Sequence, residues 1–117
     1  MSSIIDLLAS TQGLRGDDSN IALAKEIAST ENKEAIKELV DNLKNKDKNI
    51  QSDCIKTLYE TGYLKPTLIA GYYSEFLELL SSKNNRLVWG GMIALSTIAE
   101  IKPDEIFKSL DLIMKTV

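Results

Sequence analysis

The chain has 117 residues, of which 44% are hydrophobic and 26% charged, with 2 Pro and 6 Gly. This composition predicts one globular domain with enough apolar surface to bury a core. With no His and a single Cys, the sequence lacks a zinc site of His and Cys ligands, a disulfide framework and the usual base of Ser-His-Asp or Cys-His catalysis. The net charge of −3 argues against nucleic acid or an anionic membrane as the partner.

The first ten residues contain no Lys or Arg, and Asp6 interrupts their apolar run, which is not the pattern of a secretory signal. The longest apolar run, residues 87–95, is too short to cross a bilayer. The lone Cys54 is typical of a reducing compartment. We therefore expect a cytoplasmic protein with no membrane partner.

Apolar residues recur at spacings of three and four through most of the chain, which is the period of the α-helix. No stretch alternates apolar and polar residues as a half-buried strand would, so we expect an all-α fold of about seven helices. The predicted helices are, in chain order, Ser3–Ser10, Asn20–Ser29, Lys33–Asn45, Lys48–Gly62, Thr67–Ser82, Arg86–Ile101 and Asp104–Thr116.

The sequence repeats itself at a spacing of 37 residues, at which Lys65-Pro66 aligns with Lys102-Pro103. The first helix of the repeating unit matches three times without a gap. Its four apolar positions hold Ile36, Tyr73 and Leu110; Leu39, Phe76 and Ile113; Val40, Leu77 and Met114; and Leu43, Leu80 and Val117. This agreement indicates a helix hairpin that repeats.

We therefore expect a single domain over residues 1–117. It contains a degenerate N-terminal repeat in 1–30, two repeats in 33–66 and 67–103, and the first helix of a further repeat in 104–117.

Polar residues and prolines mark the ends of the predicted helices. Proline after lysine ends the second helix of each hairpin, because the residue before a proline disfavours the helical conformation. Thr67 and Asp104 follow these prolines, where an N-cap is wanted. Asp47 and Asn84 lie in the tight turn inside each hairpin, where a short polar side chain can bond the free amides of the next helix.

Cys54 and Gly91 occupy aligned positions, and both residues are small, which suits a close approach of two helices. We interpret Cys54 as a small core residue and not as a reactive thiol.

The segments LVDNLKNKDKNIQSDCIKTL and FLELLSSKNNRLVWGGMIAL carry a family resemblance. With Leu-x-x-Leu in the first helix and a polar turn before the second, they resemble HEAT and armadillo-type repeats. The resemblance covers residues 33–117 well and the first thirty residues poorly. It implies a right-handed α-α superhelix, that is, a short α-solenoid of helix hairpins that binds partners without a cofactor.

The chain departs from this family pattern at one place. Such repeats usually carry a basic residue just after the first apolar position of the second helix, and here those places hold Gln51 and Val88. The sequence therefore does not predict the ladder that such basic residues form with the turn aspartates.

The predicted helix Arg86–Ile101 has two distinct sides. Its buried side is defined by Leu87, Gly91, Leu95 and Ile98, widened by Val88, Met92 and Ala99. Its opposite side, which resembles the concave lining of HEAT-like stacks, carries Arg86, Trp89, Ile93 and Glu100.

Trp89 has two interpretations. It is an aromatic anchor for a protein or peptide, with Arg86 beside it for an acidic group, or the superhelix curls enough to bury it against the neighbouring hairpin. We take Arg86, Trp89 and Ile93, with Lys56 one repeat earlier, as the candidate partner-binding residues.

The last predicted helix carries the full apolar set of a first helix, with no second helix after it. Its candidate contact residues are Phe107, Leu110, Ile113 and Met114. Three interpretations compete: the chain is a fragment of a longer array, two copies form a homodimer through this helix, or the helix has one covered side.

Carboxylates in pairs, such as Glu34 with Glu38 and Glu75 with Glu78, lie at predicted helix starts and turns. We attribute them to favourable placement against helix dipoles, and not to acid–base catalysis. No metal or cofactor motif is present, so we predict a non-catalytic scaffold with a protein or peptide partner. The alternatives are a HEAT-like DNA glycosylase, which would be expected to be basic and rich in Arg, and a HEAT-like bilin lyase; the chain has two Arg, Arg15 and Arg86.

Overall fold

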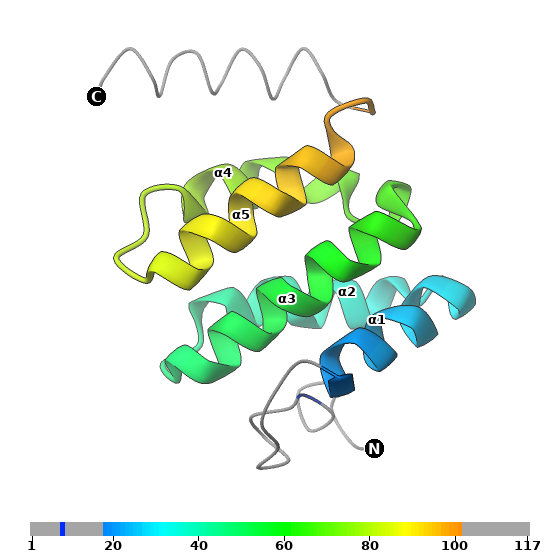
Figure 1. Ribbon diagram of the computed structural model, residues 1–117, viewed down its shortest axis with the longest axis horizontal. Helices are drawn as coiled ribbons and strands as arrows, with labels where there is room; N and C mark the ends of the chain where they lie inside the picture. Colours follow the sequence, from blue (N-terminus) through cyan, green and yellow to red (C-terminus); the bar gives the residue numbers. More distant parts are fainter. Residues whose placement is uncertain (1–7, 9–17, 102–117) are drawn as a thin grey trace.

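A computed structural model describes Leu8 and residues 18–101 (Figure 1). This part of the chain is all helical, with no strand, which confirms the predicted all-α class. Its five α-helices are α1 Asp18–Thr30, α2 Lys33–Asp41, α3 Lys48–Leu64, α4 Tyr73–Leu79 and α5 Asn85–Ile98. Short 3₁₀ turns occupy Asn42–Lys44, Pro66–Leu68 and Ala70–Tyr72. The predicted helices Ser3–Ser10 and Asp104–Thr116 lie outside the described residues.

The helices form two layers. In Figure 1, α1, α3 and α5 lie side by side in the nearer layer, and α2 and α4 lie behind them. Within the nearer layer α3 contacts both α1 and α5, while α2 packs against α3 and α4 against α5. The chain therefore passes from one layer to the other in two successive hairpins, α2–α3 and α4–α5.

Side chains of the hairpin turns cap the second helices as the sequence predicts. One carboxylate oxygen of Asp47 accepts hydrogen bonds from the backbone amides of Asn49 at 2.8 Å and Ile50 at 3.4 Å. The side-chain oxygen of Asn84 accepts one from the amide of Arg86 at 3.1 Å. Such caps satisfy amides that have no partner within the helix.

The segment before α4 differs from the predicted helix Thr67–Ser82. Residues 66–72 form two 3₁₀ turns, α4 begins only at Tyr73, and Thr67 does not cap it. Thr67, Ile69 and Gly71 have low helix propensity, and the irregular path inserts Ile69 as a fully buried side chain beside Gly62 of α3. Tertiary packing of Ile69 therefore replaces the predicted first turns of this helix.

Some equivalent positions of the 37-residue unit are buried in both copies. Leu39 of α2 and Phe76 of α4 are fully buried, and Cys54 and Gly91 both lie in the core. The prediction that Cys54 is a small core residue is confirmed.

Two consecutive glycines seat α5 against two other helices. A Cβ atom on Gly90 would lie 2.5 Å from Cγ1 of Ile55 in α3. A Cβ atom on Gly91 would lie 3.0 Å from Cβ of Leu79 and 3.1 Å from the carbonyl oxygen of Phe76, both in α4. Further along the same seam, Thr97 of α5 lies directly against Gly62 of α3. The helix backbones approach one another closely because Gly62, Gly90 and Gly91 carry no side chain.

An amide bridge joins the two hairpin turns. The side-chain nitrogen of Gln51 donates to the backbone carbonyl oxygen of Asn45. The side-chain oxygen of Gln51 accepts from the side-chain nitrogen of Asn84 at 3.1 Å. Gln51 therefore connects consecutive turns. The bridge is neutral, and it needs the amide group of Asn84 as a donor.

We expect Gly90→Ala to destabilise the fold by about 1–3 kcal/mol, because the new methyl group overlaps Ile55. Gly71→Ala is the matched control: no neighbouring atom lies within 4 Å of its added methyl group, so its stability stays unchanged or rises slightly. Urea denaturation measures both. Equal stability of the two variants would contradict the close approach of α3 and α5.

We expect Asn84→Asp to lower stability by about 1 kcal/mol, although Asp caps a helix as well as Asn does, because it removes the donor to Gln51. Adding Gln51→Arg to this variant restores a donor and recovers the loss. Asp47→Asn, the reverse change at the aligned turn, serves as control with little effect. Denaturation of the wild type, Asn84→Asp, Gln51→Arg and the variant with both substitutions, in a double-mutant cycle, checks the coupling. Independent, additive effects would show that the bridge carries no energy.

Candidate functional site

The candidate site lies on the outward side of α3 and α5. On α5, Gly90 and Thr97 face α3 and Gly91 faces α4, which directs Trp89 outward and places Ile93 between this outward side and α3. On α3, Ile55 and Gly62 face α5 and Cys54 is buried, so Tyr59 and Tyr63 lie toward the same outward side. We call Tyr59, Tyr63, Trp89 and Ile93 the aromatic face.

Three contacts set α3 and α5 in register. The Gln51–Asn84 hydrogen bond, the Ile55–Gly90 contact and the Gly62–Thr97 contact follow one another along the two helices. Trp89 therefore stands at the level of Ile55, and Ile93 stands beside the next turn of α3, where Tyr59 lies. The aromatic face is contiguous across two helices that are far apart in sequence.

Trp89 is exposed over 66% of its surface, and Tyr63 over 59%. The interpretation in which the fold buries Trp89 against the neighbouring hairpin is therefore wrong. Ile93 is half-buried, since it leans toward the seam with α3. Glu100 is exposed, as predicted.

Met92 is a correction to the predicted buried side of α5. It is exposed over 50% of its surface, whereas Gly90 and Ala94 are buried. The two small residues turn toward α3, and Met92 lies about half a turn of helix away from Gly90. Helical periodicity alone does not reveal which of the small residues of α5 pack against the neighbouring helix.

Lys56 is less accessible than the sequence suggests. Its ammonium nitrogen lies 3.2 Å from a carboxylate oxygen of Glu60 and 5.0 Å from the ring centre of Tyr59. Tyr59 in turn packs edge-to-face against Tyr63, with ring centres 6.0 Å apart. Lys56 therefore orders the tyrosines, and an acidic partner would have to compete with Glu60 for it.

Arg86 lies one helical turn before Trp89 and is exposed. Among the described residues its guanidinium makes no ion pair. The structure thus brings Arg86, Trp89, Ile93 and Lys56 to one side of the molecule. Sequence reasoning missed Tyr59, and the i, i+4 spacing of Tyr59 and Tyr63 was the signal that could have revealed it.

The other candidate residues, Phe107, Leu110, Ile113 and Met114, lie outside the described residues, as do Arg15 and Asp104.

Cys54 has no nucleophilic role in this arrangement. Burial raises the pKa of its thiol from 9.0 to about 12, and the negative charges of Asp53 and Glu38 add to the effect. The thiol stays protonated at neutral pH, and the thiolate is the reactive form.

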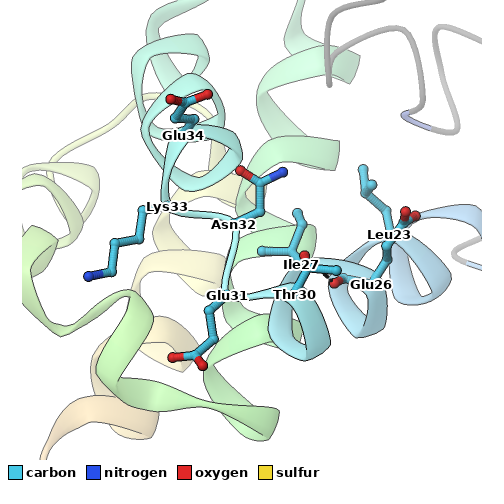
Figure 2. Close-up of a pocket in the computed structure, with 8 residues that line it drawn as sticks. All are labelled: Leu23, Glu26, Ile27, Thr30, Glu31, Asn32, Lys33 and Glu34. Atoms are coloured by element: carbon cyan, nitrogen blue, oxygen red, sulfur yellow. Dashed lines mark hydrogen bonds between the residues drawn. The ribbon is translucent and has the colours of Figure 1, made fainter.

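A surface hollow of about 530 Å³ lies where α1 meets α2, lined by residues that include Leu23, Ile27 and Asn32. Three carboxylates, those of Glu26, Glu31 and Glu34, surround it. Figure 2 shows them well apart and not directed toward a common point. Glu31 is also paired with Lys65 at 3.1 Å. The hollow therefore does not present a converging set of ligands.

The described part of the chain contains no cluster of three or more His, Cys, Asp or Glu side chains that could hold a metal ion. A search of the same residues for a helix of sufficient length and apolarity to cross a bilayer found none. No family model, no curated protein sequence and no solved structure matches the chain.

We expect Trp89→Ala to change the free energy of unfolding by less than about 0.5 kcal/mol, because the indole contributes little to the core. Thermal and urea denaturation measure this. Phe76→Ala, which empties a fully buried position, is the contrasting variant and should cost about 3–5 kcal/mol. A large loss in the Trp89 variant would show that the side chain is buried.

The raised pKa of Cys54 predicts a loss of stability in alkali. Above pH 9 the thiol ionises in the unfolded chain while it stays protonated in the folded one, so the contribution present below pH 9 falls away between pH 9 and 12. At pH 10 the loss relative to Cys54→Ala is on the order of 1 kcal/mol. Urea denaturation of both proteins from pH 7 to 10 measures it. Parallel pH profiles would contradict the burial of the thiol.

Proposed function

We propose that the chain is a short HEAT-like α-solenoid, a right-handed superhelix, that works as a non-catalytic scaffold and binds a protein or peptide on its aromatic face. The observation that carries the proposal is the exposure of Trp89, at 66%, on the same outward side as Tyr63, which is exposed further along the neighbouring helix.

The arrangement of the helices supports the solenoid. Successive hairpins repeat at 37 residues, their second helices lie side by side in one layer, and the Gln51 bridge ties one turn to the next. In repeat proteins of this kind the stacked second helices present an extended surface for partners.

The composition of the face supports binding. Trp, Tyr and Arg are enriched at the energetic centres of protein interfaces, since each supplies a large contact area with a polar group at its end. The core gains little from Trp89, whose indole is exposed to water one helical turn before Ile93. The apolar surface of these residues would be removed from water by a bound peptide.

The test selects peptides from a random library for binding to the wild-type protein and measures each with the Trp89→Ala variant. Trp89 is the single tryptophan of the chain, so its emission reports on this face alone. We expect a shift of the emission to shorter wavelength on binding, and an affinity at least about tenfold weaker for the variant, measured by polarisation of labelled peptide.

Leu64→Ala is the matched control, because Leu64 is also exposed, over 53% of its surface, but lies at the end of α3 and about half a turn of helix away from Ile55, which faces α5. It should bind the selected peptides as the wild type does. Equal affinity of all three proteins, or equal loss in both variants, would contradict the proposed binding face.

A further inference from the structure

Five basic side chains gather in the two hairpin turns that precede α3 and α5. We call residues 44–48 and 81–86 the basic turns; their cations are Lys44, Lys46, Lys48, Lys83 and Arg86. All five side chains are exposed. Within the described part of the chain, none of them takes part in an ion pair.

The fold holds these two turns next to each other. Gln51 bonds the backbone of Asn45 in the first turn and the side chain of Asn84 in the second. In the sequence alone, residues 44–48 form a local basic run. The bridge joins this run to Lys83 and Arg86, which are more than thirty residues further along the chain.

Few carboxylates offset this charge locally. Asp47 lies within the first turn, where its carboxylate accepts the amides of Asn49 and Ile50. Asp41 and Glu78 are exposed and stand three residues before the basic turns.

The acidic side chains Glu26, Glu31 and Glu34 instead lie around the α1–α2 junction. α1 and α3 run side by side in the same direction, and Asn20 near the start of α1 donates a hydrogen bond to Asp53 near the start of α3. The α1–α2 junction, at the end of α1, therefore lies at the opposite end of the helices from the turns before α3 and α5. The charges of the two ends are therefore separated.

The basic turns continue into the aromatic face. Arg86 connects the two, since it is the last residue of the second basic turn and lies one helical turn before Trp89 on α5. A chain that leaves the aromatic face along α5 toward its N-terminus therefore passes directly onto the cations.

We propose that the basic turns and Trp89 together bind an acidic segment of a partner protein, with its carboxylates on the turns and an apolar side chain on Trp89. This inference rests on the proposed function and specifies the chemistry of the partner. Charge complementarity is its basis: exposed cations without a local partner favour an anionic ligand, and Trp89 favours one that also carries an apolar group.

A protein segment fits this surface better than nucleic acid does. The whole chain has a net charge of −3, and Arg86 is the one Arg in the described part, whereas nucleic-acid surfaces are strongly basic and rich in Arg. An acidic peptide requires only a local excess of cations.

The test uses three synthetic peptides that share a central Phe-Leu pair flanked by glutamates, glutamines or lysines. We expect the glutamate peptide to bind wild-type protein most tightly and the lysine peptide most weakly, with the glutamate affinity falling as salt rises. The double variant Lys83→Glu/Arg86→Glu should bind the glutamate peptide about tenfold more weakly and lose the preference for it.

Lys33→Glu/Lys37→Glu is the matched control, because it changes the net charge by the same amount at exposed positions on α2. It should change the affinity for the glutamate peptide by less than about twofold. An equal loss in the two double variants would reduce the effect to net charge and overturn the assignment to the basic turns.

The remaining outcomes separate this inference from the proposed function. Equal affinity for the glutamate and glutamine peptides, with binding still dependent on Trp89, overturns the acidic partner and leaves the aromatic face standing. Failure of all three peptides, together with no Trp89-dependent peptide from the library, overturns both. Tighter, salt-sensitive binding of duplex or single-stranded DNA that Lys83→Glu/Arg86→Glu abolishes overturns the protein partner in favour of nucleic acid.

Discussion

The close contact of α5 with α3 determines most of what is visible in this protein. Gly90 and Gly62 carry no side chain where the helices meet, so Ile55 and Thr97 can fill the seam and bring the backbones together. A contact this close leaves little freedom to slide or rotate, because dense packing gives each side chain few alternative positions. It therefore sets the register of the two helices and the direction of their outward sides.

The bridge at Gln51 depends on this register and changes the electrostatics of the turns. An Arg–Asp ladder would place a carboxylate in each turn and pair it with a cation. Here an amide spans the turns, and the second turn has Asn84 in place of an aspartate, so the bridge contributes no charge. The surrounding lysines and Arg86 remain exposed to solvent without an ion pair in the described residues. Because the hydrogen bonds of Gln51 inside the turns are neutral, the cations around them produce a basic surface at this end of α3 and α5.

Stability and surface chemistry are divided between opposite sides of the same helices. Leu58 of α3 and Ile98 of α5 are fully buried, and the buried Cys54 stays protonated. The outward sides carry Tyr63 and Trp89, which the core does not use. This division means that the outward residues can vary with a partner's requirements at little cost to folding.

Sequence by itself determined the helical class, the spacing of the repeat, the caps at Asp47 and Asn84 and the core position of Cys54, because each depends on local periodicity or on one turn of backbone. Tertiary structure alone decided that Trp89 is exposed, that Gly90 and not Met92 enters the seam, and that residues 66–72 leave the helical path. It also joined turns that lie more than thirty residues apart into one basic surface. These features depend on how one helix is rotated and positioned against another, and a pattern within a single helix carries no information about its neighbour.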